Sequence, residues 1–199
     1  MRMLAAVILA AGESRRMGSP KALVPFHGIS FTQHLVNATR HSRVGVTRIV
    51  LGAAADEIEA KLGVDPAWIV VNRDWERGQL SSIQAAIRSF PENTEGMILC
   101  PVDNPLVSGN LVSQLIKQFD SSGKLLAIPS FHGRRGHPVI FRSVLYDELL
   151  AAQPDVGARQ VVWNHGQDVV EVPTEEEGVV LNLNDPEILK KAMGSGSQQ

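Results

Sequence analysis

The chain is poor in the features that mark several classes of protein. It has a single cysteine, Cys100, among 199 residues, which excludes an internal disulfide and a zinc site built on several cysteines. Neither sign of charge is in excess, since 19 Lys and Arg stand against 21 Asp and Glu, and this excludes a broad basic surface for nucleic acid. No apolar run approaches the roughly 20 residues of a membrane span. These absences leave a cytoplasmic enzyme or binding domain.

The length and the apolar content predict one compact domain. Hydrophobic residues make up 44% of the chain, which is enough to build a core and excludes a largely disordered protein. We expect this domain to cover residues 1–193. The low-complexity residues 194–199 (GSGSQQ) are expected to form a disordered tail.

The apolar N-terminal run, residues 3–11 (MLAAVILAA), has two interpretations. It could be the apolar region of a signal peptide, or a first strand buried on both faces. Arg15 and Arg16 follow the run, whereas a signal peptide carries its cations before it. This order of charges favours the strand and a protein that is not exported.

Strand-like and helix-like patterns alternate along the chain, which predicts a three-layer α/β fold with a mostly parallel sheet. The expected strands are 3–10, 48–51, 68–71, 96–100, 125–129, 139–141, 169–172 and 179–183. The expected helices are 32–43, 54–62, 80–89, 111–119 and 144–152. Sheets of this kind bind ligands at the carboxyl ends of their strands, so polar residues directly after strands are the candidates for a site.

The segment after the first strand, residues 9–21 (LAAGESRRMGSPK), is the most informative. Gly12 and Gly18 allow backbone N–H groups to approach an anion, and Arg16 and Lys21 supply the positive charge that a polyphosphate needs. Neither a P-loop nor the Gly-x-Gly-x-x-Gly dinucleotide fingerprint is present. The segment therefore predicts a phosphate-binding loop of another type, with a solvated surface loop as the alternative.

Acidic and amide side chains follow two other predicted strands. Asp103 comes just after strand 96–100, where a carboxylate could bind a metal–phosphate complex or form an Asx turn. Asn182 and Asn184 lie two residues apart, so in a strand both side chains would point to one face and could bind one metal. A turn with an Asn cap is the alternative for this pair.

Two further segments combine small and polar residues. Residues 72–82 (NRDWERGQLSS) run from a strand end into a helix and could contact a base or ribose, or form only a capped helix start. Residues 133–138 (GRRGHP) could hold a second, anionic substrate, or form a hairpin turn with solvated arginines.

Taken together, these segments resemble the nucleotidyltransferase family of molybdopterin cofactor synthesis over nearly the whole chain. The matching motifs are LAAGxSxRMGxxK at residues 9–21, Asn72, Gly78 and Ser82, Asp103 and Pro105, Gly-His-Pro at 136–138, Gly-Ala-Arg at 157–159 and the segment 185–189. The resemblance implies a Rossmann-like nucleotidyltransferase fold. It also implies transfer of a nucleoside monophosphate from a triphosphate to the terminal phosphate of molybdopterin, with release of pyrophosphate.

The resemblance also assigns roles to residues of this sequence. It makes Arg16, Lys21 and Asp103 catalytic, with Mg²⁺ as cofactor bound by Asp103, Asn184 and Asn182. The nucleotide is expected to contact Leu9, Ala10, Ala11, Gly12, Ser14, Arg16, Lys21, Asn72, Gly78 and Ser82. The acceptor is expected to contact Arg135, Gly136 and His137. A molybdoenzyme or its chaperone would be a protein partner, and neither nucleic acid nor membrane is expected as one.

The identity of the nucleotide rests on finer details. The Ala-Ala-Gly opening at residues 10–12 and the Gly-His-Pro motif are similar to the cytidylyltransferase branch, which implies CMP transfer from CTP. That branch usually has Asp-x-Asp near the C-terminus, where this chain has Asn182 and Asn184, as the guanylyl branch tends to have. Use of GTP, another phosphorylated acceptor and a non-catalytic nucleotide-binding module are the alternatives. An NAD-dependent oxidoreductase is disfavoured because the dinucleotide fingerprint is missing.

Overall fold

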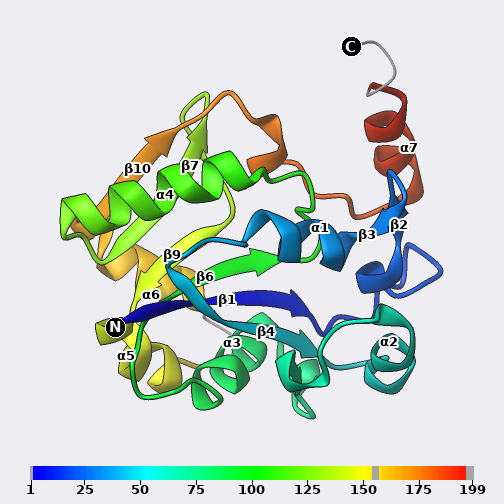
Figure 1. The fold of residues 1–199 in the computed structure, drawn as a ribbon, viewed down its shortest axis with the longest axis horizontal. Helices are drawn as coiled ribbons and strands as arrows, with labels where there is room; N and C mark the ends of the chain where they lie inside the picture. The colour runs from blue at the N-terminus through cyan, green and yellow to red at the C-terminus, as the bar shows by residue number, and fades with distance from the viewer. Residues whose placement is uncertain (1, 154–156, 196–199) are drawn as a thin grey trace.

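A twisted, mostly parallel sheet forms the centre of the computed structural model, which describes residues 2–153 and 157–195 (Figure 1). The strand order along the main path is β10-β7-β9-β6-β1-β4-β5. Their bounds are β1 (Met3–Ala10), β4 (Val44–Leu51), β5 (Ile69–Val71), β6 (Thr94–Pro101), β7 (Leu126–Phe131), β9 (Val139–Arg142) and β10 (Val169–Pro173). Only β9 runs antiparallel to its neighbours along this path. β8 (Arg134–Arg135) pairs antiparallel with β7, and β2 (Pro25–Phe26) pairs with β3 (Ile29–Ser30) in a separate hairpin.

Helices cover both faces of the sheet, so the predicted three-layer architecture is confirmed (Figure 1). One core packs α1 (Phe31–Ala38), α2 (Ala55–Leu62) and α4 (Gly109–Ser122) against the sheet. The other packs α3 (Gln79–Arg88), α5 (Tyr146–Ala151) and α6 (Ala158–Asn164) against the opposite face. α7 (Pro186–Ser195) lies at one end of the molecule, partly packed against the first core.

The N-terminal run forms β1, in the middle of the sheet between β4 and β6. Its even-numbered residues Leu4 and Ile8 face the first core, and the odd-numbered Ala5, Val7 and Leu9 face the second. A central strand with helices on both sides must be apolar at every position, which explains the continuous run of apolar residues. The strand prediction for residues 3–10 is confirmed.

Several predicted boundaries and one predicted strand are wrong. α1 ends at Ala38 and not at residue 43. At this end the hydroxyl of Thr39 donates to the carbonyl oxygen of Leu35 at 2.8 Å. Residues 179–183 form no strand. Val179 is the last residue of a short 3₁₀ turn (Glu177–Val179), and the burial of Val179 and Leu183 in the first core explains the apolar spacing.

Two differences concern the C-terminal third. α6 was not predicted, because its seven residues are too short to show a clear helical period. α7 includes Gly194 and Ser195, which the sequence analysis placed in the disordered tail. Residues 196–199 lie outside the described residues.

The lone cysteine lies in β6 and is almost completely buried. Burial raises the pKa of the Cys100 thiol to about 12, because the thiolate would lose its solvation. Thiolate is the nucleophilic form, so we expect iodoacetamide to leave the folded protein unmodified and to label one cysteine after unfolding in guanidinium. Rapid labelling of the folded protein, measured by intact mass, would contradict this burial.

Candidate active site

The carboxyl ends of β1 and β6 lie side by side and position the loops that follow them. Leu9 pairs with Pro101 in the parallel register, and the amide N–H of Val102 donates to the carbonyl oxygen of Leu9 at 3.0 Å. The loop after β1 and the loop that carries Asp103 therefore face each other across the end of the sheet.

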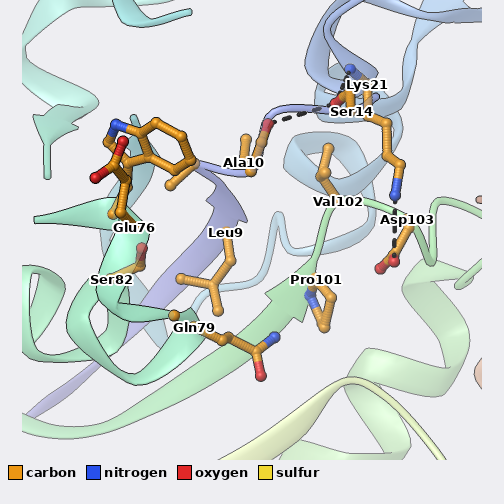
Figure 2. A pocket seen from close by; sticks show the side chains of 14 residues that line it. Leu9, Ala10, Ser14, Lys21, Glu76, Gln79, Ser82, Pro101, Val102 and Asp103 are labelled. Carbon is orange, nitrogen blue, oxygen red and sulfur yellow. Dashed lines mark hydrogen bonds and ion pairs between the residues drawn. The ribbon is translucent and has the colours of Figure 1, made fainter. Parts of the chain in front are cut away.

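A cavity of about 340 Å³ lies at this end of the sheet, between the two loops and the N-terminus of α3 (Figure 2). Eight of the residues predicted to bind nucleotide line it: Leu9, Ala10, Ala11, Gly12, Ser14, Lys21, Gly78 and Ser82. Asp103 lines it as well, together with Trp75, Glu76, Gln79, Pro101 and Val102, which the sequence analysis did not assign to the site.

Lys21 is the cation that points into the site. Its amide N–H donates to Oγ of Ser14 at 2.9 Å, which closes the loop onto the start of the 3₁₀ turn Lys21–Leu23. The ammonium donates to Oδ1 of Asn184 at 2.5 Å and lies 3.7 Å from Oδ2 of Asp103 (the Asp103 contact is drawn in Figure 2). These three side chains come from three separate segments of the chain, and we call them the Lys21 cluster.

The Lys21 cluster fits a divalent metal that also binds substrate. Hard cations take oxygen ligands, commonly one or two carboxylates completed by substrate phosphates. Asp103 and Asn184 offer one carboxylate and one amide oxygen, both already turned toward a positive charge. In the part of the chain that the structure describes, no group of three or more His, Cys, Asp or Glu is arranged to hold a metal by itself. A metal here would therefore complete its coordination with water and with substrate phosphates.

Asn182 does not join the Lys21 cluster, which corrects the expectation that the two asparagines face one metal. Its Oδ1 accepts a hydrogen bond from Nδ2 of Asn104 at 2.8 Å. The expectation assumed a strand, in which residues two apart share a face. The segment instead turns, with the amide of Asn184 donating to the carbonyl oxygen of Asn182 at 2.9 Å, so the two side chains diverge.

The other two residues predicted to bind nucleotide, Asn72 and Arg16, are not among the residues that line the cavity. Asn72 is buried behind it, and its Nδ2 donates to Oγ of Ser81 at 2.8 Å and of Ser82 at 3.0 Å. Asn72 therefore orients Ser82, which does line the cavity. Arg16 is exposed on the loop after β1 and is not among the lining residues.

A second cavity, of about 410 Å³, adjoins the first, and Gln79 lines both. All three predicted acceptor residues, Arg135, Gly136 and His137, line it. The guanidinium of Arg135 is already paired with Glu171 at 2.6 Å. The rest of the lining comes from sheet residues of the second core and from α6.

His137 lines the second cavity and interacts electrostatically with Asp103, which lines the first. Burial lowers the pKa of its imidazole, and the negative charge of Asp103 partly opposes that shift. Its Nδ1 is buried without a hydrogen-bond partner among the described residues. A buried polar atom of this kind is unusual and marks a position for a ligand or a water.

Two groups of lining residues were not assigned from the sequence. Trp75, Glu76 and Gln79 lie inside the segment 72–82, of which only Asn72, Gly78 and Ser82 were assigned to the site. Arg159 and Trp163 lie on the helix that was not predicted. The Gly-Ala-Arg motif at residues 157–159 was the available signal for them.

No helix in the described ranges is both long and apolar enough to cross a membrane.

Comparison with known proteins places this geometry in a family. A family model described as a MobA-like NTP transferase domain matches residues 6–169. Nicotine blue oxidoreductase from Paenarthrobacter nicotinovorans is 33% identical over 161 residues, 77% of this chain and 78% of that protein. A probable molybdenum cofactor guanylyltransferase from Bacillus cytotoxicus is 27% identical over 135 residues, 68% of this chain and 66% of that protein.

Solved structures share the fold over almost the whole length. Rv0371c from Mycobacterium tuberculosis superposes with a TM-score of 0.85 at 23% identity, covering 97% of this chain and 98% of that chain. A structure of the same protein in complex with manganese gives a TM-score of 0.77 at 22% identity, covering 96% and 97%. The Rossmann-like fold and the resemblance seen in the sequence are thus confirmed, and the chain belongs to the family of MobA-like NTP transferase domains.

Proposed function

We propose that the protein transfers CMP from CTP to the terminal phosphate of a molybdopterin acceptor and releases pyrophosphate. The observation that carries the proposal is the pair of adjoining cavities, with the Lys21 cluster in the first and Gln79 shared by both. A transferase needs two substrates side by side, and this arrangement provides a place for each. The proposed setting is the cytoplasm, with a molybdoenzyme or its chaperone as the recipient of the product.

The charges of the first cavity orient the triphosphate. Lys21 lies on one side of the cavity and Glu76 on the other, next to Gln79 and Ser82 (Figure 2). Phosphates are attracted by the Lys21 ammonium and by the metal proposed at Asp103, and they are repelled by Glu76, which has no cation beside it among the described lining residues. They are therefore expected beside Lys21, with the base and ribose toward Gly78 and Ser82. The ammonium has three donors, so it can bind a phosphate oxygen while it keeps its contact with Asn184.

The reaction needs little acid–base chemistry from the protein. An oxygen of the acceptor phosphate attacks the α-phosphorus and forms a new P–O bond. The bond from that phosphorus to the bridging oxygen breaks, and pyrophosphate leaves with the electron pair. A phosphate monoester is mostly ionised at neutral pH, since its second pKa is about 6, so the nucleophile arrives deprotonated. Catalysis then rests on positioning and on neutralising the charge of the leaving group, which is the role proposed for Lys21, with Arg16 on the same loop.

Asp103 and Asn184 are the residues proposed to hold the metal, and Mg²⁺ is the proposed cation. When bound, such a cation supplies charge neutralisation on the phosphates. The manganese complex of the mycobacterial structure supports a divalent cation in this fold.

The choice of CTP over GTP is supported by the Ala-Ala-Gly opening at residues 10–12 and by the Gly-His-Pro motif at 136–138. GTP is the alternative that two observations favour. The chain has Asn182 and Asn184 where the cytidylyl branch usually has aspartates, and the Bacillus relative is named a guanylyltransferase.

The proposal is tested by measuring pyrophosphate release from CTP, GTP, ATP and UTP in turn, with Mg²⁺ or Mn²⁺ and with or without molybdopterin. We expect release only with metal and acceptor present, fastest with CTP, and a cytidylylated product in the mass spectrum. Fastest release with GTP would transfer the proposal to the guanylyl branch. Nucleotide binding without release from any NTP would leave a non-catalytic binding module.

A second candidate function comes from the relative named nicotine blue oxidoreductase, which matches more than three quarters of this chain. The missing Gly-x-Gly-x-x-Gly fingerprint disfavours the usual mode of NAD binding. The similarity to an oxidoreductase can nevertheless be tested directly. Reduction of nicotine blue with NADH as the electron donor, together with no pyrophosphate release from any NTP, would favour this candidate over transfer.

A further inference from the structure

The C-terminal segment, residues 179–184, lies against the turn that follows β6. The amide N–H of Leu183 donates to the carbonyl oxygen of Asp103 at 2.7 Å, which joins the segment to this turn. The last residue of the segment is Asn184, whose Oδ1 accepts a hydrogen bond from the ammonium of Lys21. The same ammonium faces Asp103 (Figure 2). The path of the segment along the turn therefore sets how Asn184 stands relative to Asp103.

Asn104 joins the segment to the turn a second time. It follows Asp103 directly and is buried, with 2% of its surface exposed. Its Nδ2 donates to the carbonyl oxygen of Leu181 at 3.0 Å and to Oδ1 of Asn182 at 2.8 Å, a pair of hydrogen bonds that we call the Asn104 clamp. A backbone carbonyl can only accept, so the contact with Leu181 fixes the direction in which the amide of Asn104 points. The backbone N–H of Asn104 donates to Pro101 at 3.1 Å, which fixes the clamp to the end of β6.

The clamp occupies the oxygen of Asn182. An amide binds a hard cation through its oxygen, because its nitrogen carries two hydrogens and donates. In this structure the oxygen of Asn182 is directed to Nδ2 of Asn104. Asn182 is thus placed to support the metal site from the side and not as a ligand.

Two attachments hold the segment in a direction that one attachment would leave free. With the hydrogen bond of Leu183 alone, the segment could rotate about that contact and carry Asn184 away from Lys21. The clamp holds the two residues before Leu183 and blocks this rotation. The next turn passes the position on, since the amide N–H of Asn184 donates to the carbonyl oxygen of Asn182 at 2.9 Å.

We propose that Asn104 is a positioning residue, which acts through Asn182 to hold the amide oxygen of Asn184 where it and Asp103 bind one divalent cation. Groups that orient a metal ligand without touching the metal commonly contribute about 10- to 100-fold to its affinity. This inference rests on the proposed function, which makes Asp103 and Asn184 the metal ligands.

The first measurement needs neither metal nor nucleotide. The side-chain amide of Asn184 gives a pair of ¹H–¹⁵N signals in the NMR spectrum of the full chain, and Asn184→Asp identifies the pair by removing it. We expect Asn104→Ala to shift this pair, because Asn184 is then no longer held against Lys21. Asn182→Ala should shift it by less, since the contact of Asn104 with Leu181 remains.

The second measurement is the affinity for nucleotide with and without metal. The probes are the α,β-methylene analogues of CTP and GTP, which do not release pyrophosphate, titrated by calorimetry in Mn²⁺ or in EDTA. Asn104→Ala should raise the Kd in Mn²⁺ by about 10-fold or more. The Kd in EDTA should stay unchanged, since Asn104 is not among the residues that line the nucleotide cavity. Adding Asn182→Ala to Asn104→Ala should weaken binding little further, because both variants remove the same contact.

Two further variants separate positioning from general loosening. Ser108→Ala is the matched control, because it removes a nearby attachment of the same part of the chain, the hydrogen bond to Glu176, together with the cap of α4. It should lower the melting temperature but leave the signals of Asn184 and the Kd in Mn²⁺ unchanged. Asn182→Asp keeps an oxygen that accepts from Asn104, and should bind the analogues in Mn²⁺ at least as tightly as the parent.

The clamp and the transfer function fail in different ways. If no NTP releases pyrophosphate but Asn104→Ala shifts the signals of Asn184 and weakens binding only in Mn²⁺, the clamp stands and the transfer function fails. If pyrophosphate is released but Asn104→Ala and Asn182→Ala leave both the signals and the Kd in Mn²⁺ as in the parent, the inference is overturned.

Two other results would also overturn it. An effect of Asn182→Ala without any effect of Asn104→Ala would make Asn182 a ligand in its own right. Equal effects of Ser108→Ala and Asn104→Ala would reduce the clamp to one of several structural contacts. Should Asn104→Ala not fold, Asn182→Ala decides by the same two measurements, because Asn182 is exposed and its truncation leaves no cavity in the core.

Discussion

Replacing Lys21 by alanine is expected to lower kcat/KM for nucleotide transfer by about 100- to 1,000-fold, the range observed when a group that stabilises transition-state charge is removed. The ammonium is held toward the substrate by Asn184 and Asp103, and only a fraction of its side chain is exposed. Its loss would leave the departing pyrophosphate without that positive charge. The measurement is the initial rate of pyrophosphate release over a range of CTP concentrations.

Two comparisons make this test specific. Arg16→Ala removes a cation from the same loop, but Arg16 is exposed outside the cavity, so we expect a loss of less than about 10-fold because solvent and salt screen such charges. Asp103→Ala should be severe, and the double variant with Lys21→Ala only slightly worse, because the two side chains act as a unit. A folded Lys21→Ala protein with unchanged kcat/KM would remove Lys21 from the mechanism.

Replacing Gly136 by alanine is expected to destabilise the protein by about 2–3 kcal/mol, the upper part of the usual range for overpacking. A Cβ at this position would lie 2.1 Å from the carbonyl oxygen of Val179, a backbone atom that also accepts the amide N–H of His137 at 2.8 Å. Backbone cannot move aside as a flexible side chain can. The melting temperature should fall by about 5–10 °C, given the usual scaling for a chain of this size.

The same substitution should also reduce activity beyond its effect on folding. Val179 begins the segment that leads to Asn184, so a displaced Val179 disturbs the Lys21 cluster. Gly166→Ala is the matched control, because a Cβ there meets nothing within 4 Å, and its melting temperature should stay close to that of the parent. Equal melting temperatures for Gly136→Ala and Gly166→Ala would contradict the close approach at Val179.

The elements of the sheet and the loops at its carboxyl edge follow from local sequence. β1 and β6 are apolar because they are buried on both faces, and polar residues begin where each strand leaves the sheet. This local change in polarity is why Lys21 and Asp103 could be assigned to one site before their neighbours were known. The residues at the end of β1 and in the loop after it could be assigned for the same reason, namely Leu9, Ala10, Ala11, Gly12 and Ser14.

Contacts between distant parts of the chain decide which asparagine of the C-terminal segment joins the Lys21 cluster. Asn184 reaches Lys21 although 163 positions separate them, and Asn182 turns instead to Asn104. Both asparagines looked equivalent in the sequence because a period of two was the sole guide to their direction. The packing of Val179 and Leu183 into the first core sets the actual path of this segment, and therefore decides which amide faces the site.

The sequence by itself determined the family, the three-layer sheet and the position of the candidate site at one edge, because apolar periodicity and post-strand motifs are local properties. Only the tertiary structure decided which cations lie at each cavity and what they contact there. Arg135 is paired with Glu171 of β10, and Arg159 lines the second cavity from a helix too short to be predicted. Net charge is a sum over the chain, whereas the charge a ligand meets depends on which residues the fold brings together at one cavity.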